Sequence, residues 1–147
     1  AYGMHAFALD QCGRSVEAER VARLALTLGP DPWAHHALAH AFESGERWHE
    51  GRDWMTAHAD VWAGCSSFLY THNWWHAALF HLALKDSAGA LTLFDERVWA
   101  ARKDYCQDQI NAVSLLARLE LTGVDVGDRW TEVAAYVRPR RFDAIDG

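Results

Sequence analysis

Helix-starting and helix-ending residues divide this chain into short segments at regular intervals. Asp31 followed by Pro32 is a strong start signal, because aspartate can accept hydrogen bonds from free N–H groups and proline fits the first helical turn. The plausible helix ends are Gly13, Gly29, Gly45 and Gly123. Between these marks apolar residues recur at helical spacing, and strand-like alternation is hard to find. The chain is therefore predicted to be all-α.

The same signals predict about eight helices. Their expected ranges are about 2–12, 15–28, 32–44, 47–59, 71–84, 87–100, 107–122 and 128–137. The stretch 60–70 would be the longest connection, with Thr71 as a plausible cap of the helix that follows. Short connectors force neighbouring helices to run antiparallel. Residues 1–137 are thus predicted to form one helical repeat domain, and residues 138–147 a linker or a truncated next element.

The helix pairs resemble one another in the manner of tetratricopeptide repeats (TPR), which keep small residues where the two helices of a hairpin meet. In three successive pairs these small residues are Ala6 and Ala18, Ala39 and Gly51, and Ala78 and Ala90. The second copy begins about 33 residues after the first, the third about 39 residues later, and a fourth fits loosely. We therefore expect antiparallel helical hairpins stacked as a TPR-like α-solenoid, with the leading helices lining a concave groove.

Charge, cysteine content and hydropathy restrict the classes of partner. A formal net charge of -6 disfavours nucleic-acid binding, because contacts to the phosphate backbone need clustered Lys and Arg. The three cysteines are far apart and lack CxxC spacing, which favours a reducing, cytoplasmic compartment. No apolar stretch approaches the roughly 18 residues needed to span a bilayer. We expect neither a nucleic-acid nor a membrane partner.

Five segments together resemble the tetratricopeptide repeat protein 38-like family. They are AYGMHAFAL (1–9), WAHHALAH (33–40), HNWWH (72–76), SLLARLE (114–120) and GVDVGDRW (123–130). The resemblance implies a TPR-like solenoid, and it implies that this chain is an interior piece of a longer protein. It implies no particular reaction. Glu46 stands where the family more often has glycine, so we expect a slightly different turn there.

Histidines and tryptophans gather on the two helices that should line the middle of the groove. His36 and His40 are four residues apart, as are His72 and His76, so each pair lies on one side of its helix. The residues expected to face the groove are Trp33, His36, His40, Glu43, His72, Trp75 and His76. The remaining histidines have no carboxylate or imidazole partner that is apparent in the sequence: they are His5, His35, His49, His58 and His81.

Two interpretations of the cluster are open. His36, His40, His72 and His76, with Glu43, could bind Zn, Mn, Fe or Ni, and an incomplete ligand shell would leave a position for water or substrate. The run from His36 to His40 lacks the Glu that follows the first His in the HExxH zinc proteases, so that chemistry is unsupported. Alternatively, the imidazoles form a polar seam. They would then bond to one another and to Glu43, and stack on Trp33, Trp74 and Trp75.

The favoured functional hypothesis is a TPR-like scaffold whose His- and Trp-rich groove binds a peptide, a protein segment or a small ligand. The groove should then expose Trp33 and Trp75 to solvent. The alternative is a metal-binding or metal-dependent enzyme domain, with a divalent transition metal as its only cofactor. A third possibility is that the remainder of a longer chain closes over the groove. Phosphate-binding loops and nucleophile motifs are missing from the sequence, so enzymatic activity stays open and is not the favoured interpretation.

Overall fold

The computed structural model describes residues 1–101, 103 and 105–139. Within this part of the chain the structure is all-helical, and the prediction of an all-α protein is confirmed. The α-helices are α1 (Tyr2–Gln11), α2 (Ser15–Thr27), α3 (Pro32–Ser44), α4 (Trp48–His58), α5 (Ser67–Ala83), α6 (Ser87–Leu93), α7 (Cys106–Leu121) and α8 (Arg129–Val137). A 3-10 helix, η1 (Ala59–Gly64), precedes α5, and a π-helical segment, η2 (Phe94–Val98), continues α6. Most of the predicted terminal segment, 140–147, lies outside the described residues.

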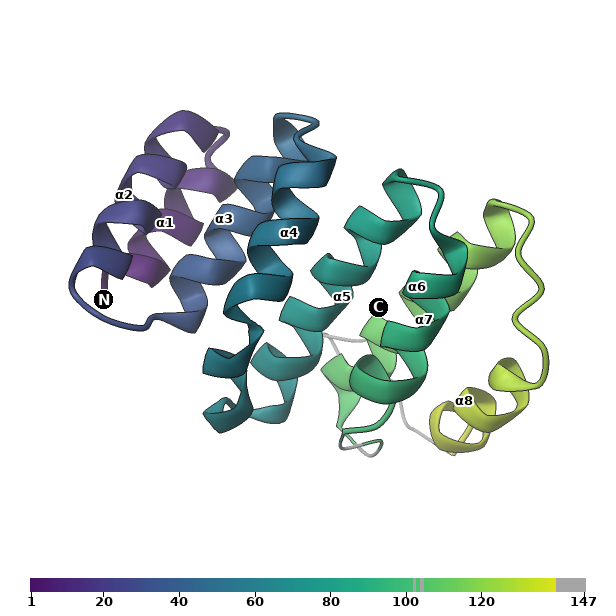
Figure 1. The fold of residues 1–147 in the computed structure, drawn as a ribbon. Coiled ribbons are helices and arrows are strands. Elements are labelled where there is room, and N and C mark those ends of the chain that lie inside the picture. The colour runs from purple at the N-terminus through teal and green to yellow at the C-terminus, as the bar shows by residue number, and fades with distance from the viewer. Residues whose placement is uncertain (102, 104, 140–147) are drawn as a thin grey trace.

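Most consecutive helices pack as neighbours along the chain (Figure 1), whereas α7 packs against α5 and η2 instead of α6. Helices α1 and α2, α3 and α4, α5 and α6, and α7 and α8 form successive pairs. The leading helices also contact one another, since α3 packs against both α1 and α5, and α5 packs against α7. Side chains from α1, α3, α5 and α7 can therefore reach a shared space on the leading-helix side.

The turns inside the four pairs share one backbone geometry. Each contains a residue with positive φ, at Gly13 (73°), Glu46 (52°), Lys85 (62°) and Gly123 (84°). The next N–H then bonds to a carbonyl five residues back, which belongs to Leu9, Phe42, His81 and Leu119 respectively. This is the Schellman arrangement of a helix end. The pairs thus repeat in the register expected for the first three, and the loosely matching fourth pair follows it as well.

Glu46 adopts this turn without the help of glycine. Its φ of 52° lies in the left-handed region, where a side chain costs about 1–2 kcal/mol. The expectation of a different turn at this position is wrong, because Glu46 N–H and Arg47 N–H make the same two bonds as in the other turns. The turn geometry is therefore maintained by the packing of α3 on α4 despite an unfavourable local preference.

Small residues allow the close helix contacts that the repeat predicts. Ala6, Ala18, Ala39, Gly51, Ala78 and Ala90 are all buried. Gly51 in α4 is the most constrained, because a Cβ built there would lie 2.3 Å from Cε1 of Phe80 in α5. The approach of α4 to α5 therefore depends on the missing side chain.

The predicted connection 60–70 is wrong. Most of it is helical, as η1 and the first turn of α5, and Thr71 lies inside α5 instead of capping it. The N-cap residue of α5, Ser66, makes no side-chain cap hydrogen bond, so this start lacks the signal on which the prediction depended. Tertiary contacts stabilise the added turn, since Leu69 is buried and Phe68 stacks on His72 at 5.2 Å between ring centroids.

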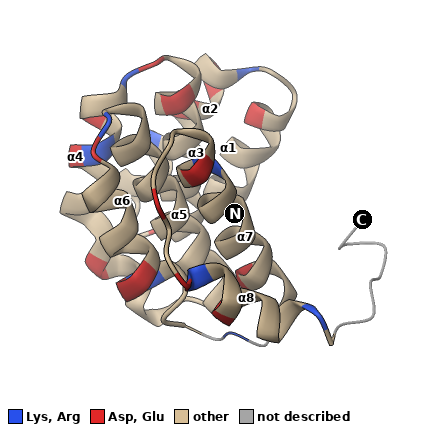
Figure 2. Ribbon diagram, turned by 90° about the vertical axis from the view of Figure 1, so that its right-hand side faces the viewer, with Lys and Arg blue, Asp and Glu red and all other residues tan. Residues whose placement is uncertain are grey.

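Two apolar clusters form the core, one around α1 to α4 and one around α5 to α8, and α5 contributes to both. Charged residues are scattered over several elements (Figure 2), and some of them join neighbouring helix pairs. Arg47, for example, bonds to Glu19 of α2 at 2.5 Å. Among the described residues no helix is both long and apolar enough to cross a membrane.

A candidate metal centre of four histidines

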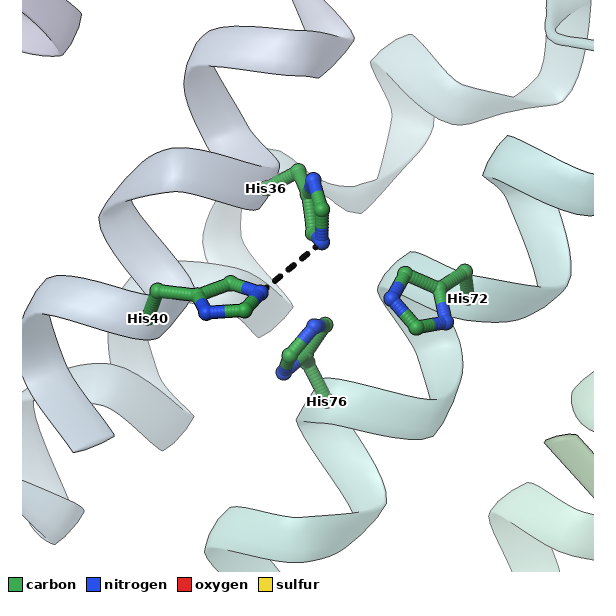
Figure 3. Close-up of side chains that lie close together, drawn as sticks. All are labelled: His36, His40, His72 and His76. Atoms are coloured by element: carbon green, nitrogen blue, oxygen red, sulfur yellow. Dashed lines mark hydrogen bonds between the residues drawn. The ribbon is translucent and has the colours of Figure 1, made fainter. Parts of the chain in front are cut away.

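The four histidines singled out by their spacing meet between α3 and α5. His36 and His40 project from α3 toward His72 and His76 of α5 (Figure 3), and one ring nitrogen from each lies within 4.8 Å of the others. The rings are in direct contact across the two helices, with centroids 4.8 Å apart for His36 and His72 and 4.7 Å for His40 and His76. The prediction that these imidazoles share one space is confirmed.

Carboxylates from two helices bond to two of the imidazoles at Nδ1, called here the outer nitrogen because it faces away from the other rings. Nδ1 of His40 lies 3.1 Å from Oδ2 of Asp10 in α1. Nδ1 of His76 lies 2.6 Å from Oε1 of Glu43 in α3. An ionised carboxylate can only accept, so each ring donates from Nδ1 and its Nε2 keeps a lone pair when the ring is neutral. Nε2 of His76 is buried and has no hydrogen-bond partner among the described residues.

A chain of buried polar residues holds the outer nitrogen of the third imidazole. The Thr71 hydroxyl donates to Oδ1 of Asp108 at 2.6 Å, and Nδ2 of Asn111 donates to the same hydroxyl oxygen at 3.2 Å. The amide oxygen of Asn111 therefore faces Nδ1 of His72, 2.9 Å away. Because that oxygen can only accept, His72 carries its proton on Nδ1 and presents a bare Nε2.

His36 has no such support. Its Nε2 lies 3.0 Å from Nε2 of His40, and its Nδ1 is buried without a hydrogen-bond partner in the described chain. The ring is enclosed by Phe7, at 4.7 Å between centroids, and by Trp33, at 5.5 Å. His36 therefore differs from the other three in having no hydrogen-bond partner at Nδ1 among the described residues.

Aromatic side chains surround the cluster, although not all of those predicted. Trp75 stacks on His72 with centroids 5.2 Å apart and planes 8° from parallel. Trp33 and Trp75 are partly buried, so each exposes only part of its surface. Trp74, expected to stack on the histidines, instead packs against Trp62, 4.9 Å away, and against Tyr70.

Burial keeps three of the four imidazoles uncharged. Desolvation lowers the pKa of His36, His72 and His76 below the ordinary imidazole value, and the neighbouring histidines lower the pKa of His36 and His76 further. At neutral pH these rings are therefore neutral, which is the form that binds metal. Burial also raises the pKa of Glu43 to about 7, although about a quarter of its side chain (24%) is exposed.

The expectation that the other histidines lack an imidazole partner is wrong for His35 and His58, whose ring centroids lie 5.8 Å apart. His35 is buried and accepts a hydrogen bond from the indole N–H of Trp62 at 3.0 Å. His5, His49 and His58 are exposed. The expectation that His81 lacks a carboxylate partner is wrong, because its Nδ1 lies 2.7 Å from Oδ2 of Asp86 across the turn after α5.

A cavity of about 420 Å³ adjoins the centre. It is lined by Glu43, Trp48, Leu79, Leu82, Ala83, Arg118, Leu121 and Thr122. Glu43 belongs both to this cavity and to the cluster, through its bond to His76. Arg118 lies over the ring of Trp75, 5.3 Å from its centroid. The polar end of the cavity is thus formed by side chains that also contact the histidine cluster or its aromatic wall.

No protein-family model matches the chain, and no solved structure matches it either. The functional assignment therefore depends on the geometry of the site. Sequence reasoning found the four imidazoles and Glu43 but missed Asp10, Asn111 and Asp108, the outer partners from α1 and α7. Asp10 lies among other polar residues near the end of α1, and Asp108 and Asn111 are two of several polar residues in α7, so their spacing gives no signal.

Proposed function

We propose that this protein binds a divalent transition-metal ion between α3 and α5, through at least three nitrogens of His36, His40, His72 and His76. The observation that supports this proposal is the convergence of four imidazoles within 4.8 Å, three of which have a hydrogen-bond acceptor at Nδ1. Histidine ligands of metals almost always have such an outer partner, which fixes the tautomer and the ring orientation.

The donor set favours zinc, copper, iron or nickel. Imidazole nitrogen suits these ions, whereas magnesium and calcium prefer oxygen. A tetrahedral site with metal–nitrogen distances of about 2.0–2.1 Å places neighbouring nitrogens roughly 3.3 Å apart. Contraction from the present spacing of up to 4.8 Å requires small side-chain rotations. The outer carboxylates of Asp10 and Glu43 would offset part of the ion's charge.

The alternative, a polar seam without a ligand, explains the contacts less well. A seam should pair the buried nitrogens, yet Nδ1 of His36 and Nε2 of His76 are buried and have no hydrogen-bond partner in the described residues. Buried polar atoms are normally satisfied, and each exception calls for an explanation. A bound ion would supply the missing partner of His76.

A second function is supported by the adjoining cavity. The helix pairs, with their repeated turns and the contacts among leading helices, are consistent with a TPR-like solenoid, and the 420 Å³ cavity lies at the end of α3, α5 and α7. In this proposal it receives an apolar group of a small ligand or of a peptide. That peptide could belong to another protein or to the remainder of a longer chain. Leu79, Leu82 and Leu121 would contact the apolar group.

Metal analysis tests the main proposal. Protein purified without a nickel column, incubated with Zn²⁺ at pH 8 and desalted, should retain about one metal ion per chain. At that pH Glu43 is mainly ionised, because its pKa is about 7. The double variant His40→Ala/His72→Ala should lose the metal, while His49→Ala, at an exposed position, should keep it. Retention below about a tenth of an equivalent by the wild-type protein would refute the proposal.

A further inference from the structure

We infer that His40, His72 and His76 are the metal ligands, and that His36 instead donates a hydrogen bond to an anionic oxygen ligand at the fourth coordination position. The inference rests on the proposed metal binding and specifies its chemistry. It predicts a three-histidine centre that is open to hydroxide, or to the carboxylate or another small oxyanion of a bound ligand, instead of a closed four-histidine site.

The three proposed ligands have the same hydrogen-bond arrangement. Each donates Nδ1–H to an acceptor on another residue, and each is left with a lone pair on Nε2. The acceptors are Asp10 for His40, Asn111 for His72 and Glu43 for His76. Because these acceptors come from three different helices, α1, α7 and α3, the three lone pairs are oriented independently of one another.

His36 has the opposite proton arrangement. Its Nε2 and that of His40 are 3.0 Å apart, so one of them must donate to the other. Nδ1 of His40 donates to Asp10, and we assign its Nε2 as the acceptor of the bond from His36. His36 therefore carries its proton on Nε2, pointing into the cluster. A nitrogen that carries a proton cannot bind a metal.

Moving that proton from Nε2 to Nδ1 would leave His36 with a buried N–H that has no hydrogen-bond acceptor among the described residues. If His36 bound the metal through Nε2, its proton would have to lie on Nδ1, which is buried and has no acceptor among the described residues. An unpaired buried donor weakens binding by roughly ten- to a hundredfold. Phe7 and Trp33 contact the ring, and their side chains offer no oxygen or nitrogen lone pair to accept that proton. Ligation by His36 is therefore disfavoured, whereas donation from Nε2 costs nothing further.

Charge and access favour an anionic oxygen as the fourth ligand. Three neutral imidazoles add no negative charge, and the outer carboxylates of Asp10 and Glu43 offset only part of the ion's double positive charge, so a fourth ligand with negative charge is stabilised. Nε2 of His36, which carries that proton, faces the space between the four rings (Figure 3). A quarter (25%) of the His40 side chain is exposed, so the four imidazoles are not fully enclosed.

Cobalt substitution separates ligands from the proposed donor. At pH 8, His40→Ala, His72→Ala and His76→Ala should each weaken Co²⁺ binding by about a hundredfold or more, whereas His36→Ala should weaken it by less than about tenfold. His49→Ala is the matched surface control. Circular dichroism melting curves, recorded without metal, identify any variant that fails to fold.

Anion binding gives a readout that a packing role would not produce. Azide serves as the anionic probe, and it should change the visible absorption of the wild-type Co²⁺ protein. His36→Ala should weaken azide binding about tenfold, and His36→Gln, which restores an N–H donor, should recover part of it. If all four alanine variants lose Co²⁺ binding equally, or if azide leaves the cobalt spectrum unchanged, the role assigned to His36 is overturned but the proposed metal binding is not. If the wild-type protein binds no Co²⁺, the proposed function fails as well.

Discussion

His35 makes the stability of this fold depend on pH in a predictable direction. Its side chain is 2% exposed and accepts a hydrogen bond from the Trp62 indole at 3.0 Å. Protonation would bury a charge and place a proton where the indole now donates. Burial accordingly lowers the pKa of His35 from 6.5 to about 4.

The size of the effect follows from that difference. Between pH 6.5 and about 4 the unfolded chain binds the proton and the folded protein does not, so the free energy of unfolding decreases as pH falls. A pKa difference of about 2.5, at 1.36 kcal/mol for each pKa unit, corresponds to a loss on the order of 3 kcal/mol. The contribution is fully present above pH 6.5 and is lost by about pH 4.

Urea unfolding, followed by circular dichroism at several pH values, isolates this contribution. His35→Gln keeps an acceptor for Trp62 but cannot be protonated. Between pH 6.5 and 4 its stability should therefore fall less steeply than that of the wild type, by about 1 kcal/mol per pH unit. Other histidines titrate in both proteins, so the difference reports His35, and His49→Gln serves as the exposed control. Parallel loss of stability in wild type and His35→Gln would refute this reasoning.

Two further predictions concern the backbone. Glu46→Gly should raise the free energy of unfolding by about 1 kcal/mol because it relieves the left-handed φ of 52°. As a control, Glu17→Gly within α2 should lower it by a similar amount. If denaturant unfolding shows no stabilisation of Glu46→Gly, the turn assignment is contradicted. Gly51→Ala should destabilise by about 1–3 kcal/mol because its Cβ would collide with Phe80. Gly64→Ala, with open space at the same test position, should have little effect, and equal thermal shifts for the two variants would be inconsistent with the close packing of α4 on α5.

The sequence was sufficient to predict the helical class and the histidine cluster because both depend on local periodicity. His36 and His40 occupy one face of α3 whatever surrounds it, and the repeat register placed His72 and His76 opposite them. The same local reasoning failed at Thr71, where a cap signal was assumed. The Thr71 hydroxyl instead bonds to Asp108, a residue 37 positions away that no local pattern connects to it.

The outer partners of the site could not be predicted for a related reason. Asp10 and Asn111 act on His40 and His72 only because α1 and α7 flank α3 and α5. In the sequence Asp10 is a polar residue near a helix end, and Asn111 is one of several polar residues in its helix. Their role arises from three-dimensional packing, and it is these partners that distinguish a candidate metal centre from a group of buried histidines.

X-ray absorption of the Zn²⁺-loaded protein tests the central claim most directly. We predict nitrogen or oxygen neighbours at about 2.0–2.1 Å, with outer-shell scattering from at least three imidazole rings. Sulfur neighbours at about 2.3 Å, from Cys12, Cys65 or Cys106, would contradict the account. A shell of oxygen atoms without imidazole scattering would contradict it equally.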